Sequence, residues 1–336
     1  MAIFSSDPRL PRELECKIFE MAALSCPTTI PKLMLVARRV KYWMDPRLPR
    51  ELECKIFKMA GLARPTTIPN LILVARRVKY WVEPLLYRVL VLSSAGPKDS
   101  GHGFPVMDDP LTLRLVMARK PSGFSRKTVK RIFIRTPNVS YEQMEWVLTA
   151  CGNVFDLCTP RLSCRAIAHL YNLRRLAVPI DQFLDCCRTN RPHPILSNIT
   201  HLDLHATSTG RSLMPEDFYQ CLYLVSNLTH LALCFISQFQ TAPLCANTHL
   251  KCILFVDLGP PSAIGDMWLQ DPIVRDPRFV YMARRDFYSN WLLHGDTGRD
   301  FWALADAFIA ARRQGKVERS RFTLSDEETS WLDSII

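Results

Sequence analysis

Residues 198–204 have the sequence NITHLDL and residues 227–233 have the sequence NLTHLAL, so two segments of the chain are identical at five of seven positions. In both segments leucines alternate with other residues, and this period of two is typical of a β-strand with one buried face. The segment between them contains MPEDFYQCLYLVSN, in which apolar residues recur at helical spacing. The pair therefore predicts an alternation of strands and helices.

Short apolar segments of the same kind recur on both sides of this pair. They begin at residues 129 (VKRIFI), 154 (VFDL), 173 (LRRLAV), 199 (ITHLDL), 228 (LTHLAL) and 250 (LKCILF). Their spacings scatter around the 20–29 residues of a leucine-rich repeat, in which each unit pairs a short strand with a helix or turn. Residues 129–258 thus resemble a degenerate leucine-rich-repeat region, without the asparagines that usually follow the strand.

A tandem repeat lies near the start of the sequence. Residues 7–44 and 45–82 align at an offset of 38, and only seven of the 38 positions differ. Each copy predicts two amphipathic helices, separated in the first copy by CPTTIP and in the second by RPTTIP. A VLVLSS segment follows the second copy, whereas the first runs directly into the second. We therefore expect the second copy to be the working module and the first to be redundant.

The motif LP-x-EL-x(3)-IF, followed by L-x-LVARRVKYW, resembles the F-box, in particular the F-box-like openings of a group of mushroom (Agaricomycete) proteins. The segment DFWALADAF at residues 300–308 resembles the end of the same proteins. This resemblance implies docking on an acidic Skp-type adaptor, which would link an unknown protein substrate to a cullin ubiquitin ligase. The docking residues that it implies are Leu10, Pro11, Leu14, Ile18 and Phe19 in the first copy, and Leu48, Pro49, Leu52, Ile56 and Phe57 in the second.

These patterns predict a mixed α+β or α/β fold in five parts. The parts are an F-box-like copy at 7–44, a second copy at 45–92, a loop with a connecting helix at 93–128, the repeat-like α/β region at 129–258, and a C-terminal strand with capping helices at 259–336. In the last part we expect Asp300 to cap a helix whose buried stripe contains Phe301, Leu304 and Phe308.

The strand motif also suggests a polar site. His201, Asp203 and His205 should lie on one face of their strand, and His230 occupies the matching place in the sister strand. Two imidazoles and a carboxylate can bind zinc or iron. The same pattern arises when a strand shows polar side chains to solvent, and Ala232 replaces the carboxylate in the sister strand. We therefore expect a partner-contact face and no metal.

The cysteines predict neither a metal site nor a disulfide framework. Twelve are scattered along the chain without a CxxC pair. The gaps between Cys151, Cys158, Cys164 and His169 are wider and less regular than in common zinc motifs. Reduced, buried thiols in an intracellular protein are the expected state.

Charge and motif content limit the function classes. Residues 1–92 hold 16 Lys and Arg against 8 Asp and Glu, so most of the net charge of +11 lies there and would attract an acidic partner. The sequence has no nucleophile elbow, P-loop, dinucleotide fingerprint or HExxH motif, which predicts a protein without enzymatic activity or cofactors. It has no run of about 18 apolar residues and no secretory signal, so we expect a cytoplasmic or nuclear location without a membrane partner.

Two alternatives stay open. The basic stretch ARRVKYW occurs twice and would suit a nucleic-acid-binding protein, although no known nucleic-acid-binding motif accompanies it. The chain would otherwise be a globular fungal protein whose F-box is vestigial.

Overall fold

The computed structural model describes residues 50–93, 103–135, 139–188, 194–205, 215–234, 241–257, 271–283, 291–292 and 300–325. The chain divides into two compact units, Met1–Leu86 and Tyr87–Ile336, which we call the first and the second unit. The first repeat copy at 7–44 lies outside the described residues, as do Leu48 and Pro49 of the second copy.

The described part of the first unit is helical. It contains α3 (Arg50–Ala63), a 3-10 turn (Pro65–Thr67), α4 (Ile68–Ile72) and α5 (Arg76–Leu86). α3 ends before Pro65 because a proline disfavours helical geometry in the preceding residue. The expected second helix of this copy is in fact two helices, α4 and α5, separated by a turn at residues 73–75. This turn allows the apolar faces of both short helices to reach one core.

That core consists of residues from all three helices. Its buried members are Ile68, Leu71, Val78, Trp81 and Val82 of α4 and α5. From α3, Cys54 and Phe57 pack against them. Since one face of α3 is used in this way, its opposite face is left for solvent or for a partner.

The second unit is built on one ten-stranded parallel sheet, which confirms the prediction of a mixed α/β fold. The strand order is β10-β9-β8-β7-β6-β5-β4-β3-β1-β2. From β3 to β10 each strand therefore lies beside the next one in the sequence, and β1 lies between β3 and β2. The strands are β1 (Val89–Leu92), β2 (Val106–Met107), β3 (Arg131–Ile134), β4 (Asp156–Cys158), β5 (Arg175–Pro179), β6 (His201–His205), β7 (His230–Leu233), β8 (Cys252–Asp257), β9 (Phe279–Ala283) and β10 (Thr323–Ser325).

Apolar residues in register explain why these strands stack. Leu176 of β5 pairs with Leu202 of β6, which pairs with Leu231 of β7 and, through it, with Ile253 of β8. The same row continues on both sides, and all of these side chains are buried in one core. Each strand alone is too short to be stable, and stacking buries a continuous apolar row.

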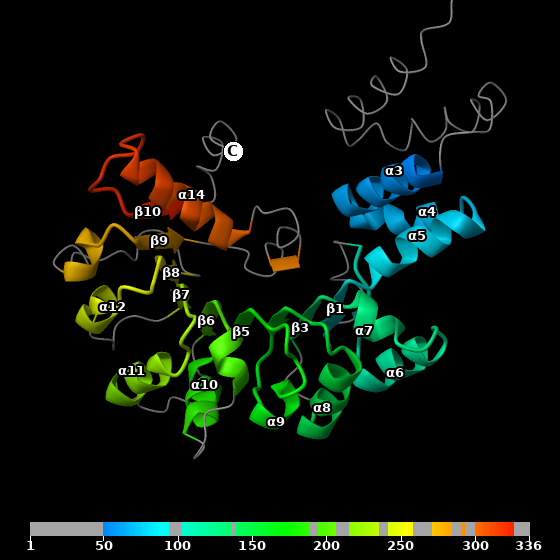
Figure 1. The fold of residues 1–336 in the computed structure, drawn as a ribbon, viewed down its shortest axis with the longest axis horizontal. Helices are drawn as coiled ribbons and strands as arrows, with labels where there is room; N and C mark the ends of the chain where they lie inside the picture. Colours follow the sequence, from blue (N-terminus) through cyan, green and yellow to red (C-terminus); the bar gives the residue numbers. More distant parts are fainter. Residues whose placement is uncertain are drawn as a thin grey trace, which may run out of the picture. The chain divides into compact units, whose positions relative to one another are not determined.

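Helices cover the face of the sheet that carries this row, which we call the helix face (Figure 1). They are α6 (Pro110–Ala118), α8 (Tyr141–Ala150), α9 (Cys164–Ile167), α10 (Ile180–Cys187), α11 (Pro215–Tyr223) and α12 (Ala242–Ala246), with the short α7 (Phe124–Thr128) before β3. Local caps fix where they begin: Asp109 accepts bonds from two backbone amides of α6, and Ser140 and Gln143 form a capping box at α8.

The other side of the sheet, which we call the polar face, is partly covered by α14 (Phe301–Arg313) (Figure 1). Phe301, Trp302 and Phe308 of this helix are buried against β8, β9 and their neighbours. Asp300 accepts a hydrogen bond from the Ala303 amide at 2.9 Å, which confirms the predicted cap. The buried aromatic side chains therefore hold α14 on the sheet.

The unit boundary differs from the predicted one. β1 pairs with β3, so residues 87–92 belong to the sheet and not to the helical module expected at 45–92. The region expected to be a loop with a connecting helix, 93–128, contributes β2, α6 and α7 to the second unit. The reason is that VLVL at residues 89–92 is a fully buried strand, whose apolar residues need a place in a sheet that is covered on both faces.

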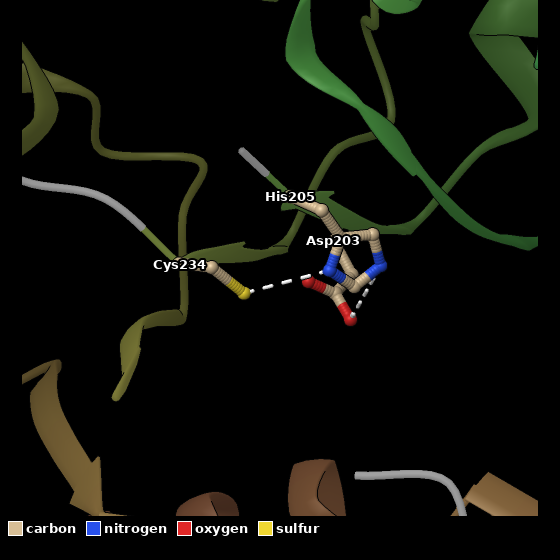
Figure 2. Close-up of side chains that lie close together, drawn as sticks. All are labelled: Asp203, His205 and Cys234. Atoms are coloured by element: carbon tan, nitrogen blue, oxygen red, sulfur yellow. Dashed lines mark hydrogen bonds and ion pairs between the residues drawn. The ribbon is translucent and has the colours of Figure 1, made fainter. Parts of the chain in front are cut away.

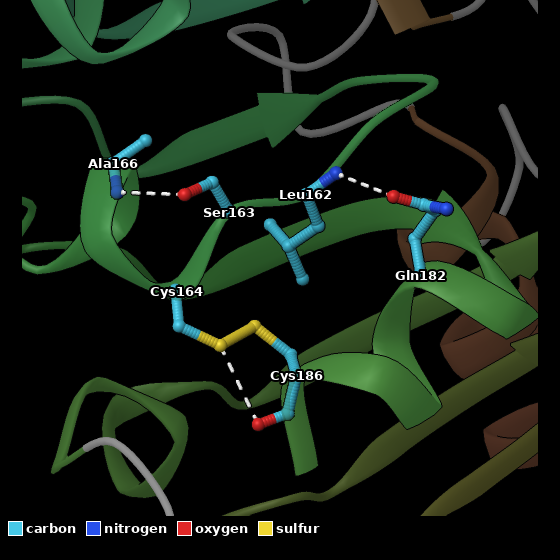
Figure 3. The surroundings of a disulfide bond; sticks show 6 residues. All are labelled: Leu162, Ser163, Cys164, Ala166, Gln182 and Cys186. Atoms are coloured by element: carbon cyan, nitrogen blue, oxygen red, sulfur yellow. Dashed lines mark hydrogen bonds between the residues drawn. A yellow bond between two sulfur atoms is a disulfide. The ribbon is translucent and has the colours of Figure 1, made fainter. Parts of the chain in front are cut away.

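One pair of cysteines departs from the expected reduced state. Cys164 of α9 and Cys186 of α10 form a disulfide, with their Cα atoms 5.7 Å apart (Figure 3). Two short helices side by side on the helix face bring them together, which their separation of 22 residues in the sequence does not reveal. Among the described residues the other eight cysteines, Cys54, Cys151, Cys158, Cys187, Cys221, Cys234, Cys245 and Cys252, are free thiols, as predicted.

Reduction of this disulfide is expected to lower the melting temperature of the second unit. A cross-link over a separation of 22 residues stabilises a fold by about 3 kcal/mol, because it limits the unfolded chain. In a unit of this size the loss corresponds to about 6–12 °C in differential scanning calorimetry. The variant Cys164→Ser with Cys186→Ser is the control, since its melting temperature should not change with reductant. Equal responses of both proteins would contradict the prediction.

Candidate functional site

Polar residues stand in register across five strands on the polar face. Arg131 pairs with Asp156, Asp156 with Arg175, Arg175 with His201, and His201 with His230. We call these five residues the polar column. They are the first residues of β3 to β7. A pocket lies over part of the column, and Trp291 and Trp302 are among the residues that line it.

A buried ion pair begins the column. The Arg131 Nε lies 3.1 Å from Asp156 Oδ2, and both side chains are almost completely buried. Arg131 also donates to the backbone carbonyls of Trp291 and Leu292, and its guanidinium lies 4.0 Å from the Trp291 ring centroid. Burial raises the pKa of Asp156, while the charges of Arg131 and Arg175 oppose that rise. The ionised form of the buried Asp156 carboxyl group is therefore stabilised by its two arginine neighbours.

Arg175 connects the column to α14. Its guanidinium forms an ion pair with Asp300, the same residue that caps α14. One carboxylate therefore holds the start of the helix and a side chain of β5 together, although these residues are far apart in the sequence.

Two histidines form the middle of the polar face. The rings of His201 and His230 are stacked with centroids 4.1 Å apart, and Trp302 contacts both edge-on. His230 Nε2 lies 3.1 Å from Asp306 Oδ1 of α14. Burial lowers the pKa of His201 to about 2, and the charges of His230 and Arg175 act in the same direction. His201 is therefore neutral at physiological pH.

Asp203, His205 and Cys234 form a second group on this face, which we call the DHC cluster (Figure 2). Cys234 Sγ lies 3.5 Å from His205 Nδ1, and His205 Nε2 lies 3.8 Å from Asp203 Oδ2. Burial raises the pKa of the Cys234 thiol well above its usual value, and Asp203 and Asp257 raise it further. The three residues offer one oxygen, one nitrogen and one sulfur ligand atom, all within 4.8 Å of one another.

The predicted partner-contact residues thus belong to two different groups. Asp203 and His230 are only 3% and 8% exposed, and His201 and His205 are partly buried. The prediction that this row faces solvent is wrong for Asp203 and His230, because α14 and neighbouring side chains cover that part of the face. Leu202 and Leu204 point to the opposite, helix-face core, as the period of two predicts.

The predicted docking residues divide in a similar way. Leu52 and Ile56 of α3 are exposed by 47% and 53%, and Met59 and Leu62 extend this apolar surface. We call these four residues the α3 face. Phe57 is partly buried and packs against the core of the first unit. It lies on the other side of the helix because residues 56 and 57 are adjacent in the sequence and so differ by about 100° in direction.

Sequence reasoning missed Cys234 and three members of the polar column, Arg131, Asp156 and Arg175. Cys234 follows NLTHLAL directly, and alignment of the two strand motifs places it opposite His205. The three charged residues begin strands whose sequences differ from one another, so only the strand register of the structure places them in one row.

The structure places Cys151, Cys158 and Cys164, whose gaps are wider than those of common zinc motifs, in different parts of the second unit. Cys164 is in the disulfide, Cys151 lies in the helix-face core, and Cys158 lies on the polar face. The sheet therefore separates Cys151 from Cys158.

No family model matches this chain, and no curated protein matches it. Among the described residues, none of the helices is both long enough and apolar enough to cross a membrane.

Proposed function

We propose that this protein is a non-enzymatic substrate receptor, in which an F-box-like first unit docks on a Skp-type adaptor and the second unit holds a protein substrate. The observation that carries the proposal is the α3 face, an apolar surface on the helix that bears the F-box-like motif. Monomeric proteins do place single apolar residues on their surfaces, but neighbouring ones on a helix are typical of a helix that meets a partner.

The charges around this face favour an acidic partner. Lys55 and Lys58 are exposed on α3 and flank Ile56 in the sequence. An apolar strip flanked by lysines fits a partner whose apolar groove has an acidic rim, because complementary charges speed association and orient the two proteins. An acidic adaptor has this chemistry.

The second unit supports the receptor role by its architecture. Its parallel strands follow one another in the sheet, with helices on one side and leucines in register between repeats. This is the organisation expected of a leucine-rich-repeat-like stack, whose opposite face usually serves for binding. Here the partly exposed His201 and His205 belong to that face.

The test measures binding of a purified Skp-type adaptor to the full chain by isothermal titration calorimetry. Leu52→Asp with Ile56→Asp is expected to weaken binding about a hundredfold or more, because each apolar side chain buried at an interface contributes roughly 1.5–3 kcal/mol. Circular dichroism should show an unchanged fold, since both side chains are exposed. Absence of adaptor binding by the unmodified chain would refute the proposal.

Two matched variants identify the surface. Leu111→Asp with Leu115→Asp changes two exposed leucines of α6 in the second unit and should leave binding unchanged. Leu14→Asp with Ile18→Asp makes the same changes in the first repeat copy, and binding should again persist. Loss of binding only in this last variant would move the docking site to the first copy.

The nucleic-acid alternative receives less support from the first unit. Arg77 of the basic stretch is bound to Glu53 through Nε at 3.1 Å and Nη2 at 2.9 Å, and Trp81 is buried in the core. Tyr80 is 79% exposed and remains the residue able to stack on a base. If the chain bound duplex DNA with an affinity that fell steeply with salt, and did not bind the adaptor, this alternative would replace the proposal.

A further inference from the structure

The DHC cluster unites three kinds of metal ligand, two on β6 and one directly after the neighbouring β7. Asp203 and His205 lie two residues apart on β6, so their side chains share the polar face. Cys234 follows β7, and its amide donates to the Leu204 carbonyl at 3.1 Å, which holds it beside His205. Hydrogen-bonded backbone on both strands therefore positions all three side chains.

The spacing of these atoms is close to that of a tetrahedral zinc site. Zn–S bonds of about 2.3 Å and Zn–N or Zn–O bonds of about 2.0–2.2 Å place neighbouring ligand atoms about 3.3–3.6 Å apart. Cys234 Sγ and His205 Nδ1 are 3.5 Å apart, which is within this range. All three ligand atoms lie within 4.8 Å of one another. Asp203 Oδ2 lies nearer to the other ring nitrogen, 3.8 Å from His205 Nε2, so ion binding requires rotation of the Asp203 side chain or of the imidazole to bring both partners to one nitrogen.

The chemistry of the ligands selects the class of ion. A thiolate and an imidazole favour Zn²⁺ and other borderline or soft cations over Mg²⁺ and Ca²⁺, which prefer oxygen ligands alone. A thiolate at Cys234 and a carboxylate at Asp203 together balance a divalent cation, while His205 is neutral as a ligand. Binding would release the thiol proton of Cys234 to solvent.

We infer that Asp203, His205 and Cys234 bind one Zn²⁺-class cation, with the fourth coordination position left to water or to an external ligand. Three protein ligands with an open fourth position are the pattern of zinc sites that act on, or are completed by, another molecule. His201 takes no part, because its ring is stacked on His230. The site is independent of the proposed adaptor docking, which concerns the first unit.

The test uses the full chain without a histidine tag, freed of metal by a chelator and then titrated with Zn²⁺ and with Co²⁺. We expect one ion per chain, and for Co²⁺ a thiolate-to-metal charge-transfer absorption in the near ultraviolet. Cys234→Ser should remove this absorption, and Asp203→Asn and His205→Gln should each weaken Zn²⁺ binding at least tenfold. Circular dichroism of each variant verifies that it is folded.

Two control variants separate this site from other histidines and thiols of the chain. His201→Ala removes a histidine from the same face of the same strand, and binding should be unchanged. Cys221→Ala removes a thiol that is hydrogen-bonded to Cys187 on the helix side, and the cobalt absorption should persist. The inference is overturned if the unmodified chain binds no ion, if Cys234→Ser keeps the absorption, or if Cys221→Ala loses it.

Discussion

Replacement of Arg131 by methionine is expected to lower the free energy of unfolding of the second unit by about 3–5 kcal/mol at pH 7, because it leaves the buried Asp156 carboxylate without its ion-pair partner. The carbonyls of Trp291 and Leu292 lose a donor at the same time. Urea unfolding followed by tryptophan fluorescence measures the change.

The cause of this loss can be checked by pH. Burial raises the pKa of Asp156 above its unfolded value, so the folded state takes up a proton more readily than the unfolded state does. A raised carboxyl pKa means that this group destabilises the fold increasingly as pH rises above the unfolded pKa of about 3.9. Removal of Arg131 raises this pKa further. The cost of Arg131→Met should therefore be smaller at pH 5 than at pH 7.

A double variant provides the control for the ion pair. Arg131→Met with Asp156→Leu removes both charges, and it should be more stable than Arg131→Met alone, because no buried carboxylate remains unpaired. If the double variant were as unstable as the single one at both pH values, loss of packing and not loss of the ion partner would explain the effect.

Phe308→Ala is expected to destabilise the second unit by about 3–5 kcal/mol. The side chain is completely buried between α14 and the sheet, so its removal loses apolar contacts and leaves a cavity. Calorimetry of the full chain measures the fall in melting temperature, which should be about 2–4 °C for each kcal/mol lost.

Leu304→Ala is the matched control on the same helix. Leu304 lies one turn before Phe308 and is only partly buried, so its truncation should cost clearly less. Equal losses in both variants would contradict the prediction, because the cost would then not follow the burial of the truncated side chain.

Much of the fold could be predicted from the sequence because its signals are local. The alternation in NITHLDL and NLTHLAL specifies two strands, and each structural strand from β3 to β8 overlaps one of the predicted apolar segments, although β4, β5, β6 and β8 extend one or two residues beyond it. Asp300 is also a local signal, since a helix cap acts within a few residues of its own position.

The side of α3 on which a residue lies is also a local property. Ile56 and Phe57 were grouped as one docking stripe because the F-box-like motif contains both. Helical geometry separates adjacent residues, and the structure accordingly places Ile56 outside and Phe57 against Trp81 and its neighbours. This part of the candidate site could have been predicted from the sequence alone.

The polar face could not be predicted in the same way, because its arrangement depends on distant parts of the chain. The position of α14 over β8 and β9 decides that His230 is buried while His205 is only partly so. Arg131 meets Trp291, 160 residues further along the chain. No pattern within one repeat contains that information.

The strand order has a consequence for synthesis on the ribosome. From β3 onward, each new strand emerges when the strand that it pairs with has already left the exit tunnel. The sheet can therefore grow by addition at one edge. Contacts that must wait are those of Arg131 with Trp291 and of Arg175 with Asp300, 160 and 125 residues later. Until the C-terminal segments appear, Arg131, Arg175 and the Asp156 carboxylate between them would remain hydrated. Packing of α14 on the sheet would then be a late step of folding.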